Sequence, residues 1–63
     1  MALKVGDRVE FKGEQINGEY LQGEIVVLEN NRWDMITSYF AVLDEGMYVQ
    51  FKPHNFNWLK VEE

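Results

Sequence analysis

The chain has 63 residues, of which 11 are Asp or Glu and 6 are Lys or Arg, so its formal net charge is -5. This length corresponds to one domain with a small core, and the absence of cysteine excludes a disulfide framework and thiolate metal sites. The acidic balance argues against nucleic-acid binding, which depends on basic side chains that neutralise phosphates.

The first predicted strand follows a short tail at residues 1–4. It is marked by Val9 and Phe11, which alternate with charged residues as in a half-buried strand. A loop is expected over residues 13–18, where Asn17-Gly18 is the strongest turn signal. If strands flank that pair closely, the tip of a hairpin lies there.

The second predicted strand runs from about Tyr20 to Glu29, and Gly23 within it predicts a bulge or a sharp bend. Asn30-Asn31 can adopt the left-handed backbone of a tight turn. The third strand is therefore predicted to follow that turn, from about Arg32 to Leu43.

The fourth predicted strand covers Met47 to Lys52, after a turn at residues 44–46. Pro53 ends it because proline cannot donate a hydrogen bond to a sheet ladder. The segment from Pro53 to Asn57 has the length of one 3₁₀ turn. A fifth strand from Trp58 to Val61 then closes the predicted barrel.

One inward face per strand would fill the interior of a single closed sheet. In the third strand this pattern is expected to point Phe40 inward and Tyr39 outward. The predicted core consists of the apolar residues that share one face of each strand: Val9, Phe11, Ile25, Val27, Ile36, Phe40, Val42, Val49, Phe51, Leu59 and Val61.

The predicted elements follow one another as a strand, a long loop, a three-strand meander, a short turn and a final strand. The segments that carry this pattern are residues 5–9, 23–26, 39–46 and 53–59. This order resembles the SH3-like barrel superfamily, including its Tudor and KOW modules. The resemblance covers nearly the whole chain. It implies one all-β domain over residues 1–63, a five-stranded barrel with a short 3₁₀ turn before the last strand. A fold of this kind hosts many functions, so the resemblance by itself assigns none.

Three segments are also similar to the plasmid-borne type II dihydrofolate reductases, which are tetramers of SH3-like barrels around one pore. The segments are Gly6-Asp7-Arg8-Val9, Gln22-Gly23-Glu24-Ile25-Val26 and Val49-Gln50-Phe51. The resemblance implies a pore lined by Gln50 and Phe51. Lys52 stands where the family has a tyrosine. Phe11 stands where it has a lysine, although Lys12 is adjacent.

Aromatic and polar residues off the predicted core register form a candidate binding face. The predicted ligand-binding residues are Trp33, Tyr39, Tyr48, Gln50 and Trp58. Amphipathic aromatics of this kind are typical of interaction hot spots, and the acids Asp34, Asp44 and Glu45 are expected to steer a basic ligand toward them. The same pattern fits an extended core, or a self-association surface to which Met35, Ala41, Leu43 and Met47 would add apolar area.

The long loop after the first strand often borders the ligand groove in SH3 domains. The resemblance therefore makes Glu14, Gln15 and Glu19 further candidates for contact with a basic ligand. His54 is the single histidine and Ser38 the single serine, and no orienting acid marks them as a catalytic pair. We predict no catalytic residue, no metal ligand and no cofactor.

No apolar stretch reaches the roughly 20 residues of a membrane span, and the first residues lack the apolar segment of a signal peptide. We therefore expect a cytoplasmic, non-enzymatic interaction module, an accessory protein of bacterial or phage type, that binds a protein or peptide segment through the aromatic face. The alternatives are a homotetramer like the type II dihydrofolate reductases and a nucleic-acid-associated module like the Tudor and KOW domains. Self-association is left open.

Overall fold

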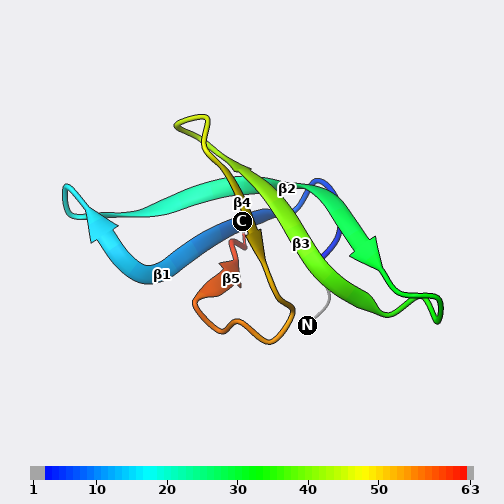
Figure 1. The fold of residues 1–63 in the computed structure, drawn as a ribbon. Coiled ribbons are helices and arrows are strands. Elements are labelled where there is room, and N and C mark those ends of the chain that lie inside the picture. The colour runs from blue at the N-terminus through cyan, green and yellow to red at the C-terminus, as the bar shows by residue number, and fades with distance from the viewer. Residues whose placement is uncertain (1–2, 63) are drawn as a thin grey trace.

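In the computed structural model, residues 3–62 are described and form one antiparallel sheet. Its strands are β1 (Arg8–Ile16), β2 (Glu19–Asn30), β3 (Ile36–Leu43), β4 (Tyr48–Phe51) and β5 (Trp58–Lys60). Their order across the sheet is β4-β3-β2-β1-β5 (Figure 1). The predicted all-β class and the five predicted strands are confirmed. Hydrogen bonding among the described residues ends at β4 on one side and at β5 on the other, so the sheet is open.

The β1–β2 hairpin is longer than predicted. Its tip is Asn17-Gly18, with φ of 55° and 81°, because the twist of a two-residue hairpin turn requires positive φ at both positions. The loop predicted over residues 13–18 is wrong, since residues 13–16 continue β1 and Ile16 pairs with Glu19. A register shift lies between Phe11 and Gln15. The hairpin tip and the β2–β3 turn lie at opposite ends of an elongated molecule of 41 × 21 × 21 Å (Figure 1).

The β2–β3 turn takes up residues that were predicted to begin the third strand. β3 starts at Ile36, and residues 31–35 form the turn. The Asn31 side chain holds this turn, because its Oδ1 accepts hydrogen bonds from the backbone N–H groups of Trp33 at 2.9 Å and Met35 at 3.1 Å. Asp34 adopts the left-handed backbone, with φ of 59°.

The two remaining connections, β3–β4 and β4–β5, lie where turns were predicted. At the β3–β4 turn, Gly46 has φ of 95°, and its N–H donates to the carbonyl of Leu43 at 2.8 Å. Between β4 and β5, the predicted 3₁₀ turn is wrong, because residues 53–54 and 56–57 form two separate turns. The backbone N–H of Asn55 donates to the carbonyl of Lys52 at 3.0 Å, which is the spacing of a single tight turn.

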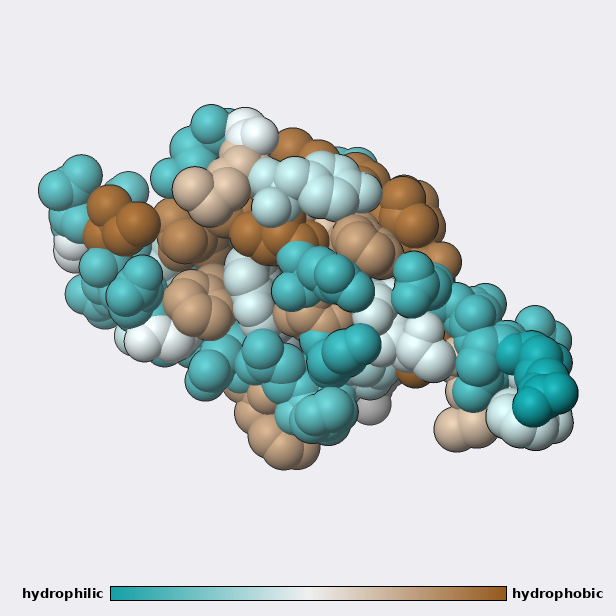
Figure 2. All heavy atoms as spheres, viewed as in Figure 1, coloured by the Kyte–Doolittle hydropathy of each residue, from teal (hydrophilic) through white to brown (hydrophobic). Residues whose placement is uncertain are grey.

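The core lies on one face of the sheet. Its buried apolar residues are Leu3, Val9, Ile25, Tyr39, Ala41, Leu43 and Phe51, and the partly buried Leu28, Ile36, Val49 and Trp58 pack against them. Burial of Val9, Ile25 and Phe51 confirms the prediction for those residues. Figure 2 shows apolar side chains gathered over the middle of the molecule, while hydrophilic side chains cover most of its two ends.

Four predicted core residues lie elsewhere. Val27 and Leu59 are exposed, and Phe40 and Val42 are half-buried on the face opposite Ala41. In β3 the inward face was assigned wrongly, because both faces of this strand are apolar and alternation alone cannot choose between them. The pairing with β2 makes the choice, and a register shift between Ile25 and Val27 turns Val27 away from the core.

A row of aromatic rings connects the two edge strands. Trp58 of β5 stacks on Phe51 of β4, with ring centroids 4.9 Å apart and an interplanar angle of 11°. The Trp58 ring also lies 4.8 Å from Phe11, and the Phe51 ring lies 5.2 Å from Tyr39. Side chains therefore join the edges of the sheet where backbone hydrogen bonds do not.

Candidate functional site

The structure does not bring the five predicted binding residues onto one face. Tyr39 is 5% exposed and belongs to the core, and Trp58 is half-buried in the aromatic row, so their predicted outward positions are wrong. Tyr48 and Gln50 are exposed on the opposite face of the sheet, as predicted. Trp33 lies apart from both groups in the β2–β3 turn, where it is 69% exposed.

Tyr39 and Trp58 do meet in a small pocket of about 210 Å³ at the β4–β5 end of the core. Its lining is mostly apolar and comprises Leu3, Tyr39, Phe51, Pro53, Asn55, Phe56, Trp58, Leu59 and Lys60. The rings of Tyr39, Phe51 and Trp58 that line it belong to the aromatic row, while Phe56 at its rim is exposed.

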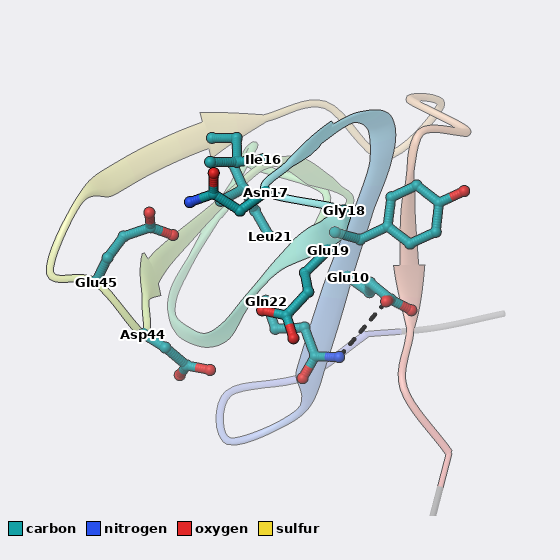
Figure 3. Close-up of a pocket in the computed structure, with 10 residues that line it drawn as sticks. Glu10, Ile16, Asn17, Gly18, Glu19, Leu21, Gln22, Asp44 and Glu45 are labelled. Carbon is teal, nitrogen blue, oxygen red and sulfur yellow. Dashed lines mark hydrogen bonds between the residues drawn. The ribbon is translucent and has the colours of Figure 1, made fainter.

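A larger groove of about 750 Å³ lies between the outer part of the β1–β2 hairpin and the β3–β4 turn (Figure 3). Four of the ten lining residues are carboxylates, and none is Lys or Arg. The lining residues are Glu10, Ile16, Asn17, Gly18, Glu19, Tyr20, Leu21, Gln22, Asp44 and Glu45. Figure 3 shows Asp44 and Glu45 on one side of the groove, Glu10 on the other, and Glu19 and Gln22 between them. The surface is acidic and open, with apolar side chains among the carboxylates.

Strand pairing positions the floor of this groove. Glu10 of β1 lies opposite Gln22 of β2, and the Gln22 Nε2 donates to the Glu10 Oε1 at 3.5 Å. The backbone N–H of Asp44 donates to the carbonyl of Gln22 at 2.9 Å, which ties the β3–β4 turn to β2. The floor and one wall of the groove are therefore fixed by the sheet.

Two of the four carboxylates are held by cations at the edge of the groove. The Arg8 guanidinium contacts both carboxylate oxygens of Asp44, at 2.9 and 2.7 Å, in the two-point geometry that favours this pair. Lys12 Nζ lies 2.7 Å from the Glu10 Oε2 and 4.4 Å from the centroid of the Tyr20 ring. These contacts orient Asp44 and Glu10.

Glu19 and Glu45 differ from this held pair. Both are exposed, and neither forms an ion pair with another residue in the described part of the chain. Their carboxylates are therefore free to meet a charge brought by a ligand.

The held carboxylates have lowered pKa values. Hydrogen bonding from Lys12 lowers the pKa of Glu10, with a further contribution from Gln22, and partial burial opposes this shift. Hydrogen bonding from Arg8 lowers the pKa of Asp44 in the same way. Both shifts favour the ionised form of the carboxylate.

We expect the contact between Arg8 and Asp44 to be lost in acid. A carboxyl group whose pKa is lower in the folded state stabilises the fold above its unfolded pKa, and this stabilisation disappears as pH falls through the folded pKa, below about pH 4. An NMR titration of the Asp44 carboxyl should therefore show a higher midpoint in Arg8→Gln than in the wild type. Lys12→Gln serves as the control and should leave the Asp44 midpoint unchanged. Equal midpoints in the wild type and Arg8→Gln would contradict this assignment.

Other reactive side chains lie outside the groove. The Ser38 hydroxyl is buried and accepts hydrogen bonds from Gln50 Nε2 at 3.1 Å and Lys52 Nζ at 3.2 Å. His54 is exposed in the turn after β4. Within residues 3–62, no three His, Cys, Asp or Glu side chains gather as metal ligands. The same residues include no helix with the length and apolarity to span a membrane.

The sequence predicted some residues of this groove and missed others. Asp44, Glu45 and Glu19 were predicted to steer or contact a basic ligand, and the structure places all three in the groove lining. Glu10 and Gln22 were missed. They lie opposite each other only because of the register shift between Phe11 and Gln15. A regular extension of the strands from Asn17-Gly18 would have paired Gln22 with Gly13 instead.

No protein-family description, curated protein or solved structure matches this chain.

Proposed function

We propose that this chain is a small non-enzymatic binding module that holds a basic segment of a partner protein in the groove between the β1–β2 hairpin and the β3–β4 turn. The observation that carries the proposal is the lining, which contains four carboxylates and neither Lys nor Arg. Charges of opposite sign across an interface speed association and select the partner. A basic segment is therefore the occupant that this groove favours.

The side chains that line the groove support a basic peptide as its ligand. Glu19 and Glu45 each offer a carboxylate to a guanidinium or ammonium group, without first breaking an ion pair with a described residue. The apolar side chains of Ile16 and Leu21 can cover the aliphatic stem of an arginine or lysine, which is itself amphipathic. The net charge of -5 adds long-range attraction for such a partner.

For the fold we propose an SH3-like barrel. The antiparallel order β4-β3-β2-β1-β5 is compatible with it, and the Phe51–Trp58 stack supports an approach of the two edge strands. Of the segment similar to type II dihydrofolate reductases, Gln50 and Lys52 are exposed while Phe51 is buried in the core. This placement gives no support to a pore lined by Gln50 and Phe51 together.

The experiment is a binding assay with a short arginine-rich peptide, with a glutamate-rich peptide of equal length for comparison, read by fluorescence anisotropy. The wild type should bind the arginine-rich peptide and should not bind the glutamate-rich peptide. The double variant Glu19→Gln/Glu45→Gln should bind it about tenfold more weakly, a loss of about 1.4 kcal/mol.

The matched control is Asp34→Asn/Glu62→Gln, which removes the same charge from exposed positions outside the groove. It should lose much less affinity than the groove variant. Equal losses in the two double variants would mean that net charge alone attracts the peptide. That result, or no binding by the wild type, would overturn the proposal.

A further inference from the structure

The sheet face opposite the core carries an ordered grid of nine side chains, which lie on β2, β3 and β4 except for Lys52, which directly follows β4. The grid has three rows across the strands, Glu24–Val42–Tyr48, Val27–Phe40–Gln50 and Glu29–Ser38–Lys52. We call these nine residues the outer face. It shares no residue with the acidic groove.

The middle of the outer face is apolar and aromatic. Phe40 is its central residue and is half-buried, with its ring centroid 6.0 Å from that of Tyr48. Val27 is 45% exposed and Tyr48 is 56% exposed, so apolar surface continues on both sides of Phe40. A contiguous patch of this kind on a small domain is typical of an interaction surface.

The charges of the outer face are divided between its two margins. The β2 margin carries the carboxylates of Glu24 and Glu29, and the β4 margin carries the ammonium group of Lys52. Hydrogen bonds to the buried Ser38 hydroxyl from Lys52 and Gln50 hold the β4 margin in place. Arg8 of β1 lies opposite Glu24, so the negative charge of the β2 margin is concentrated at Glu29, which shares a row with Lys52. The outer face is therefore negative at the Glu29 corner, apolar in the middle and positive at the Lys52 corner.

We propose that the outer face is the interface of a homodimer, with a second copy of this chain as its occupant. A two-fold axis parallel to β3 would lay β2 of each copy over β4 of the other. Phe40 would then face the partner's Phe40, and Lys52 would face the partner's Glu29. A two-fold interface requires a surface that is complementary to itself, and the division of charge on the outer face meets that requirement.

The composition of the chain is consistent with this interface. Seven apolar residues are buried in the described chain, while ten large apolar residues are exposed. Small domains commonly supplement such a limited core by oligomerisation. Eight of the nine side chains reach the surface, since Ser38 is buried. This number corresponds to the small end of specific interfaces, which bury less than about 1,200 Å² in total. The dimer population is therefore expected to depend on protein concentration.

Sedimentation velocity over a range of protein concentrations tests the proposal through charge reversal. The wild type should form dimers as concentration rises. Lys52→Glu alone and Glu29→Lys alone should each dimerise about tenfold more weakly, because like charges would then face each other. An equimolar mixture of the two variants should dimerise again, since Lys52→Glu on one copy faces Glu29→Lys on the other.

Recovery in the mixture distinguishes interface disruption from misfolding, because a misfolded variant would not recover. A wild type that stays monomeric at every concentration, or two variants that dimerise like the wild type, would overturn the proposal. The arginine-rich peptide should bind both variants whenever it binds the wild type, since neither position lines the groove. The two experiments therefore test dimer formation and peptide binding independently of each other.

Discussion

Trp58→Ala is expected to unfold most of the population at room temperature. Trp58 stacks on Phe51 at 4.9 Å and contacts Phe11 at 4.8 Å, so its removal separates β5 from β4 and opens the aromatic part of the core. Replacing a packed Trp or Phe by Ala destabilises proteins by about 3–5 kcal/mol. A single core of this size rarely provides more than about 3–5 kcal/mol in total.

Thermal unfolding followed by circular dichroism measures this effect. Trp33→Ala is the matched control, because it removes the other tryptophan from a position that is 69% exposed. An exposed substitution of that kind should change the free energy of unfolding by about 0.5 kcal/mol or less. Similar unfolding temperatures for Trp58→Ala and Trp33→Ala would refute the role given to the aromatic row.

Gly23→Ala is expected to destabilise the fold by about 1–3 kcal/mol, the range typical of an overpacked core. A Cβ at Gly23 would lie 2.5 Å from the backbone oxygen of Val42 and 2.9 Å from the Cα of Leu43. Both neighbours belong to the backbone of β3, so relief requires β2 and β3 to move apart at the centre of the sheet.

Chemical denaturation gives the free energy of unfolding for this comparison. Glu24→Ala is the control, because it lies next to Gly23 on the same strand and its side chain is exposed. We expect Glu24→Ala to remain near the wild type. If Gly23→Ala were as stable as Glu24→Ala, the close approach of β2 and β3 at this glycine would be refuted.

The number of strands and most of the turns could be predicted because local chemistry determines them. Asn17-Gly18 marks the hairpin tip, since few residue pairs tolerate two positive φ values in succession. Gly46 closes the β3–β4 turn because glycine adopts a positive φ, here 95°, without steric cost. Val9 was placed correctly because it lies between Arg8 and Glu10, which leaves one apolar face in that part of β1.

The inward face of β3 could not be predicted from alternation. Phe40 and Val42 on one face are as apolar as Tyr39 and Leu43 on the other, so the sequence pattern has no preference. Pairing with β2 decides it, and that pairing contains a register shift after Ile25 that no local signal marks. This single error placed Tyr39 on the predicted binding face, whereas its side chain lies in the core.

The acidic groove could not be predicted, because it is formed in part by residues 13–16 of β1, which the sequence pattern did not identify as strand. Residues 13–16 were predicted as loop, because Gly13 and the polar residues after it are typical of loops. Gly13 instead lies under the Phe11 ring, which would collide with any Cβ there. The strand continues past this point and forms one wall of the groove. The acids were identified from charge alone, whereas their arrangement required the fold.

Chemical-shift mapping by NMR, with the arginine-rich peptide added to the wild-type protein, tests the proposed binding groove most directly. We expect the largest backbone amide shifts on Glu19, Gln22 and Glu45, with little change at Tyr48 and Gln50. Shifts concentrated on Tyr48 and Gln50 would place the ligand on the outer face and contradict the groove. Uniformly small shifts over the whole chain would contradict peptide binding itself.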